Sequence, residues 1–127
     1  MKIRLNSVFV SDQDKTLKFY TEVLGFVRKN DFPFGQFRWL TVVSPDEPNG
    51  TELVLEPDEN PASKTFKKSV FEQGIPITAF QVDNIEEEYA RLKKLGVIFK
   101  KPPTDMGPVT MAMFDHTCGN YIQIYHV

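Results

Sequence analysis

Both histidines and the only cysteine of the chain lie in its final stretch, FDHTCGNYIQIYHV, which runs from Phe114 to Val127. Histidine and cysteine side chains bind transition metals, and a cysteine activated by a histidine can act as a nucleophile. His116 and Cys118, however, lie two positions apart, next to the turn residues Gly119 and Asn120. Catalytic cysteine–histidine pairs usually join distant segments of a chain. We therefore expect a closing hairpin here, with His116 and Cys118 as turn residues.

Glu56 is the best candidate for a catalytic residue, because a carboxylate that faces a cavity can act as a general base. It ends the alternating stretch TELVLEP, residues 51–57, directly before Pro57. The same position suits a solvated carboxylate at a strand edge, so the catalytic residues stay unknown. The acidic run 86–88 is different, because it falls in the expected first turn of a helix, where the macrodipole favours negative charge.

The composition narrows the classes of function. The chain has 127 residues, of which 41% are hydrophobic and 25% charged, as expected for one globular domain. No apolar run approaches the roughly 18 residues of a membrane span, and the N-terminus turns polar too early for a secretory signal, so we expect a cytoplasmic protein. The net charge of −2 without a basic stripe argues against nucleic acid as a partner. A small-molecule ligand is the more natural expectation.

A repeated pattern of elements must position these residues. Residues 3–10 alternate as a strand, Asp12 is a helix N-cap, and Gly25 ends the helix. Strands are expected from residue 26, at 35–43 and at 51–57. The order returns with a strand from residue 77, the cap Asn84, the helix end Gly96 and strands near 97–99, 108–114 and 121–127. The caps are 72 positions apart and the glycines 71, so the first helix holds one additional residue.

The pattern predicts an α+β fold of two βαβββ modules in tandem. Module one covers about residues 1–57, a linker with a short helix covers 58–75, and module two covers 76–127, within one domain. The expected helix stripes are Leu17, Tyr20, Val23 and Leu24, then Ile85, Tyr89, Leu92 and Leu95. On the strands, alternation assigns a helix-facing side to Val8, Val10, Leu53, Leu55, Phe80, Val82, Ile122 and Ile124.

Three stretches resemble one known superfamily. They are VSDQDKTLKFYTEVLGF at residues 10–26, FQVDNI with a helix ending LGV at 80–97, and FDHTCGNYIQ at 114–123. Together they resemble the vicinal oxygen chelate superfamily, which includes glyoxalase I, extradiol dioxygenases and bleomycin-resistance proteins. The resemblance implies that the two modules curl a mixed sheet around an open cleft, with the helices on the outer face. It also makes a homodimer the expected assembly, with modules paired within one chain or swapped between two.

Metal-dependent members of this superfamily take ligands from the first and last strand of each module, usually histidine and glutamate. The corresponding positions here are Leu5, Ile77 and Gln123, with Val54 aligned on Gln123 and Glu56 two residues further along. Leucine and isoleucine cannot bind a metal, and an amide is a poor substitute for a carboxylate. We therefore predict no metal site and no cofactor.

The leading hypothesis is a metal-free protein that binds a small organic molecule in the cleft, by sequestration, sensing or an unidentified reaction. One alternative is a metal-dependent lyase or dioxygenase with atypical ligands, Glu56 and Gln123 among them. Another is an interaction module whose cleft is filled by its own side chains. Trp39, preceded by Phe32, Phe34 and Phe37, could stack a planar or cationic ligand or could pack in a core or dimer interface. The expected ligand-binding residues are Leu5, Phe9, Trp39, Val54, Glu56, Ile77, Gln81, Tyr121 and Gln123.

Overall fold

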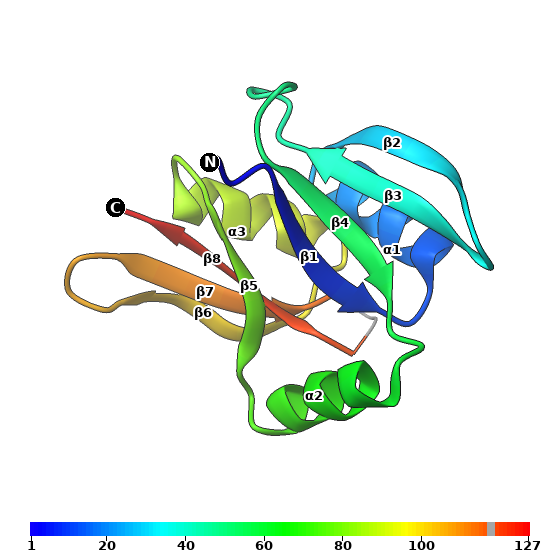
Figure 1. The fold of residues 1–127 in the computed structure, drawn as a ribbon. Helices are drawn as coiled ribbons and strands as arrows, with labels where there is room; N and C mark the ends of the chain where they lie inside the picture. Colours follow the sequence, from blue (N-terminus) through cyan, green and yellow to red (C-terminus); the bar gives the residue numbers. More distant parts are fainter. Residues whose placement is uncertain (117–118) are drawn as a thin grey trace. The chain divides into compact units, whose positions relative to one another are not determined.

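The computed structural model describes residues 1–116 and 119–127, which form two compact units, Met1–Lys64 and Thr65–Val127 (Figure 1). Cys118 lies outside the described residues, so its expected place in a turn stays a prediction. The helix α2, Pro61–Glu72, begins in the first unit and ends in the second. It corresponds to the short helix expected in the linker.

The first unit has one strand, one helical segment and three further strands. They are β1 (Leu5–Val10), α1 (Gln13–Lys18) with a π-helical continuation at Phe19–Val23, β2 (Val27–Phe34), β3 (Phe37–Val43) and β4 (Glu52–Pro57). The sheet order is β1-β4-β3-β2, in which β1 and β4 are parallel and the other neighbours antiparallel.

The second unit repeats this architecture. It contains β5 (Pro76–Gln81), α3 (Ile85–Lys94), β6 (Phe99–Asp105), β7 (Thr110–Asp115) and β8 (Tyr121–His126). The sheet order is β5-β8-β7-β6, with β5 parallel to β8. The predicted α+β fold of two tandem βαβββ modules is therefore confirmed, with one mixed four-stranded sheet in each unit.

The helix starts follow from their capping residues. Asp12 Oδ1 accepts a hydrogen bond from Lys15 N at 3.0 Å, and Asn84 Oδ1 accepts one from Glu87 N at 3.2 Å. Both predicted caps thus satisfy an N–H group that would otherwise lack an intrahelical partner. After each helix the chain turns at a glycine with positive φ, 88° at Gly25 and 91° at Gly96, a conformation that disfavours a side chain.

The additional residue of the first helix produces its π-helical segment. Leu24 N donates to Phe19 O at 3.1 Å, so the hydrogen bond spans five residues instead of four. A π-turn absorbs one residue without breaking the helix. The π-helical segment is therefore the location of the additional residue that the unequal spacings of the caps and the glycines indicated.

Each helix covers one face of the sheet in its own unit. In the first unit Val8, Val10, Tyr20 and Leu55 are buried, and in the second Ile85, Leu92, Ile122 and Ile124 are buried. These residues belong to the predicted helix-facing sets. Leu95 does not follow the prediction, because α3 ends at Lys94 and the Leu95 side chain is 52% exposed.

Candidate functional site

The face of the first sheet opposite α1 carries the ligand-binding residues that we expected in this unit. The register pairs Leu5 with Glu52 and Phe9 with Glu56 on β1 and β4. Thr41 of β3 pairs with Val54, and Trp39 of β3 pairs with Phe32 of β2. Because side chains directly opposite each other share a face, Leu5, Phe9, Trp39, Val54 and Glu56 all lie on this one.

A cavity of about 220 Å³ opens between the ends of β3 and β4. Its lining residues are Phe34, Phe37, Arg38, Trp39, Val54, Glu56, Pro57 and Glu59. Of the expected residues in this unit, Trp39, Val54 and Glu56 line the cavity, whereas Leu5 and Phe9 are not among the lining residues. Pro57 and Glu59 were not expected to take part, because they lie at and beyond the strand end, where alternation gives no face.

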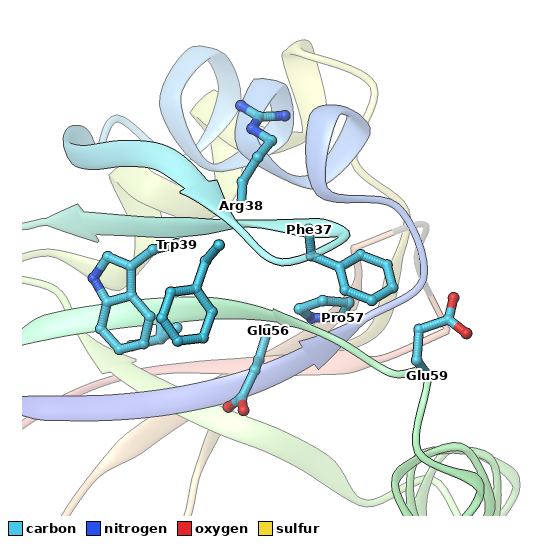
Figure 2. A pocket seen from close by; sticks show the side chains of 8 residues that line it. Phe37, Arg38, Trp39, Glu56, Pro57 and Glu59 are labelled. Atoms are coloured by element: carbon cyan, nitrogen blue, oxygen red, sulfur yellow. The ribbon is translucent and has the colours of Figure 1, made fainter.

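The cavity wall is aromatic. Phe34 and Trp39 lie with ring centroids 6.1 Å apart at an interplanar angle of 57°, and Phe34 is 66% exposed. In Figure 2 the rings of Phe37 and Trp39 lie on one side of β3, and the Arg38 side chain extends on the other side. The rings thus leave an apolar hollow instead of packing together into a closed core.

The Arg38 guanidinium is held by carboxylates away from the cavity. Its Nε and Nη2 donate to the two carboxylate oxygens of Asp31 at 2.9 and 2.8 Å, and its Nη1 donates to Asp14. The hydrogen bond and positive charge of Arg38 lower the pKa of Asp31, and Asp31 and Asp14 raise the pKa of Arg38. Among the cavity residues, this leaves Glu56 and Glu59 as the acidic groups without that cation beside them.

A polar cluster missed by the sequence analysis lies on the same face. Glu52 Oε1 accepts from Asn30 Nδ2 at 2.8 Å and from Thr41 Oγ1 at 2.7 Å, while Asn30 N donates to the fully buried Thr41 hydroxyl. Alternation along β4 places Glu52 on this face, but spacing within one strand does not show its partners, because the three residues come from three different strands. The cluster satisfies a half-buried carboxylate with neutral donors.

In the second unit the strand register places Gln81 and Gln123 on one face of the sheet but leaves Ile77 outside the regular alternation. Gln123 of β8 pairs with Ala79 of β5, and Gln81 pairs with Tyr125, so both glutamines lie on the side opposite Ile122 and Ile124. Ile77 falls at a register shift between Pro76 and Thr78, outside regular alternation.

Tyr121 is already in contact with other side chains. Its ring stacks on Phe71 of α2 with centroids 4.4 Å apart and an interplanar angle of 13°, and Lys100 Nζ lies 5.1 Å from the ring centroid. A ligand would have to displace Phe71 to stack on the face of the ring that Phe71 covers. Tyr121 thus packs on α2, and its part in a ligand site stays a prediction.

Both histidines make local structural hydrogen bonds. His116 is fully buried, and its Nε2 lies 2.8 Å from Asn120 Nδ2. His126 Nδ1 accepts from Ile85 N at 3.0 Å and so serves the first turn of α3. Neither residue lies on the first strand of a module.

The strand register allows the metal positions to be compared between units. Ser7 and Thr41 pair with Val54, and the residues 72 positions later, Ala79 and Met113, pair with Gln123. Val54 and Gln123 are therefore structurally equivalent, as the sequence alignment proposed.

The donor set at these positions does not fit a metal. Leu5, Ile77 and Val54 have no donor atom in their side chains, and Gln123 offers only an amide. Among residues 1–116 and 119–127, no three or more His, Cys, Asp or Glu side chains cluster in a way that could hold an ion.

The sequence also matches a family model over residues 3–124, described as the Glyoxalase/Bleomycin resistance protein/Dioxygenase superfamily. The chain belongs to this superfamily. Within it, the chain is similar to YurT of Bacillus subtilis (strain 168), described as uncharacterized, with 58% identity over 98% of each protein. The superfamily is thus established by sequence over nearly the whole chain.

Two solved structures are similar to this chain over nearly its whole length. The crystal structure of UcmS2 has 32% identity and a TM-score of 0.84, covering 98% of this chain and 97% of that one. The structure of TnmS3, an antibiotic-binding protein from Streptomyces sp. CB03234, has 29% identity and a TM-score of 0.79, covering 99% and 95%. Among the described residues, no helix has both the length and the apolar character that a membrane span requires.

Proposed function

We propose that the protein is a metal-free binding protein for a small aromatic molecule that carries a positive charge. The observation that carries this proposal is the cavity lined by Phe34, Phe37 and Trp39 together with Glu56 and Glu59. Aromatic faces attract cations, and two carboxylates without the Arg38 cation beside them add to that attraction. The similarity to an antibiotic-binding protein supports an organic ligand over a metal-activated substrate.

The size of the cavity limits the ligand. Its volume of about 220 Å³ is below the roughly 300–1,000 Å³ of sites that enclose a drug-sized molecule. The cavity therefore suits one fused ring system, or one ring-bearing arm of a larger molecule. An interaction module with a filled cleft would instead have Phe37 and Trp39 packed into this space.

A pair of matched probes tests the proposal. Naphthylmethylammonium and naphthylmethanol have the same ring system and differ in charge, so their dissociation constants can be compared by calorimetry. We expect the cationic probe to bind more tightly by about tenfold, the equivalent of one charge-assisted contact. Equal affinities would contradict the proposed preference for a positive charge. If neither probe binds, the proposed binding function of this cavity is contradicted.

The proposed absence of a metal has its own test. Elemental analysis and native mass spectrometry of the purified protein would detect a tightly bound divalent ion. The side chains at the superfamily's ligand positions predict less than stoichiometric metal. About one ion per chain would instead favour the metal-dependent lyase or dioxygenase alternative.

We also propose a homodimer that acts in the cytoplasm. Exposed apolar side chains support an interface between two copies, among them Ile3 at 84%, Leu5 at 50% and Phe32 at 48% exposure. Light scattering coupled to size exclusion should give twice the mass of the chain. A single-chain mass at micromolar concentration would contradict the dimer.

A further inference from the structure

We propose that Gln13 is a positioning residue that holds the ends of β3 and β4 apart and so keeps the cavity between them open. The ligand-binding part of this inference rests on the proposed function, whereas the structural part does not. Gln13 is the first residue of α1, and its side chain reaches the backbones of both strands.

The ladder between β3 and β4 is short. It consists of the pairs Thr41–Val54 and Val42–Leu53, whereas β2 pairs with β3 along the whole of β3. Continuing the register would place Arg38 opposite Pro57, and proline has no N–H group to donate to a ladder. Pro57 therefore explains why the ladder does not continue to the strand ends. The carbonyl groups of these ends still need hydrogen-bond partners.

Gln13 supplies those partners. Its Nε2 donates to Arg38 O at 2.8 Å and to Leu55 O at 3.0 Å, and its Oε1 accepts from Arg38 N at 3.3 Å. One carboxamide thus replaces a stretch of ladder with hydrogen bonds to both strands. The side chain occupies space that two directly paired strands would close.

The bridged backbone groups adjoin the cavity. Arg38 itself lines the cavity, and Leu55 directly precedes Glu56. Trp39 and Glu56, which the continued register would place opposite each other, are both lining residues. The separation of the strands and the cavity therefore occur at the same point of the sheet.

The second unit provides an internal comparison. The residue 72 positions after Gln13 is Ile85, which is fully buried and has no carboxamide. There the ladder between β7 and β8 runs from Asp115–Tyr121 to Thr110–His126. Thr41 corresponds to Met113, and Val54 corresponds to Gln123. The same two offsets make Thr110 the equivalent of Arg38 and His126 the equivalent of Pro57. The unit without the glutamine has its strand ends paired.

Hydrogen exchange tests the structural part. In Gln13→Leu, the Arg38 amide should exchange about tenfold faster, as expected from the loss of one hydrogen bond, while the Val42 amide stays protected by the intact ladder. Gln73→Leu is the matched control, because Gln73 bonds only within the last turn of α2 at Ser69. Unchanged exchange at Arg38 would overturn the proposal whether or not any probe binds.

Affinity tests the positioning role. Below the unfolding temperature of the variant, naphthylmethylammonium should bind Gln13→Leu at least about tenfold more weakly than wild type or Gln73→Leu. A residue that merely stabilises the fold would lower the melting temperature and leave this dissociation constant unchanged, which would overturn the positioning role. Failure of the proposed function would be distinct, because wild type itself would then bind no probe.

A measurement on the wild type covers the case in which Gln13→Leu does not fold. The Gln13 carboxamide hydrogens, held by two carbonyl oxygens, should exchange at least about tenfold more slowly than those of the exposed Gln36. Equal exchange rates for the two carboxamides would show that Gln13 does not bridge the strands.

Discussion

The carboxylate partners of the Arg38 guanidinium affect the charge of the cavity, because they hold this cation on one side of β3. It forms a two-pronged contact with Asp31 and a further hydrogen bond with Asp14 on the helix-facing side of β3. A guanidinium matches a carboxylate in this geometry better than an ammonium does. Arg38 lines the cavity, but its guanidinium charge is paired with Asp31 and Asp14 on the other side of β3 from the Trp39 ring.

The Asp31–Arg38 pair predicts a pH-dependent contribution to stability. The pKa of Asp31 is lowered from its ordinary value of 3.8 by Arg38, so the contribution is present above pH 3.8 and is lost as the pH falls through the lower folded-state value. Asp31→Asn should lower the free energy of unfolding at neutral pH by less than about 1 kcal/mol, because the pair is partly exposed. Urea unfolding over a range of pH should show the difference from wild type shrinking in acid. A difference that grows in acid would contradict this account.

Glu56 predicts a charge-selective loss of binding. Glu56→Gln keeps the size of the side chain and removes its negative charge. Naphthylmethylammonium should then bind about tenfold more weakly, and naphthylmethanol should bind as before, because only the first probe interacts with the charge. Calorimetry with both probes measures this. Glu88→Gln is a control, because Glu88 interacts with Arg91 on the surface of α3 in the other unit. An equal loss for both probes would indicate a steric role for Glu56.

At the scale of elements, we expect removal of the helix cap to lower the free energy of unfolding by a similar amount in both modules. Asp12→Ala removes the acceptor for Lys15 N, and Asn84→Ala removes the acceptor for Glu87 N. Each change should lower stability by about 1 kcal/mol. Chemical denaturation followed by circular dichroism checks both. A neutral result at either position would mean that water satisfies the exposed N–H group.

The elements could be predicted because local chemistry defines them. Asp12 and Gly25 mark one helix, Asn84 and Gly96 mark the other, and alternation identifies strands such as β8. The spacing of caps and glycines even revealed the additional residue that becomes a π-turn. Leu95 was assigned wrongly to the buried stripe, since helical spacing alone does not say at which residue the last turn ends.

The candidate site could be predicted only in part, because its remaining features depend on contacts between distant segments. Val54 and Glu56 were expected from alternation along one strand and from the alignment of the two modules, and Trp39 from its place on an aromatic-rich strand. Gln13 was not, because its partners lie 25 and 42 positions away. The stacking of Tyr121 on Phe71 likewise depends on how the part of α2 after Lys64 packs on the second unit.

At the scale of the molecule, one architecture occurs twice with different local details. The strand ends are paired in the second unit and bridged by Gln13 in the first, where the cavity lies. The superfamily's metal positions hold no carboxylate or histidine in either unit. We therefore infer that the first unit provides the organic-ligand site of the proposed function.

One titration tests this central claim most directly. The chain has a single tryptophan, so the nitrogen–proton NMR spectrum should contain one indole cross-peak, from Trp39 in the cavity wall. Titrating naphthylmethylammonium into protein treated with EDTA should move that peak in a saturable way, and adding zinc or manganese should not change the affinity. A peak that does not move, or that moves only after metal is added, would contradict the account.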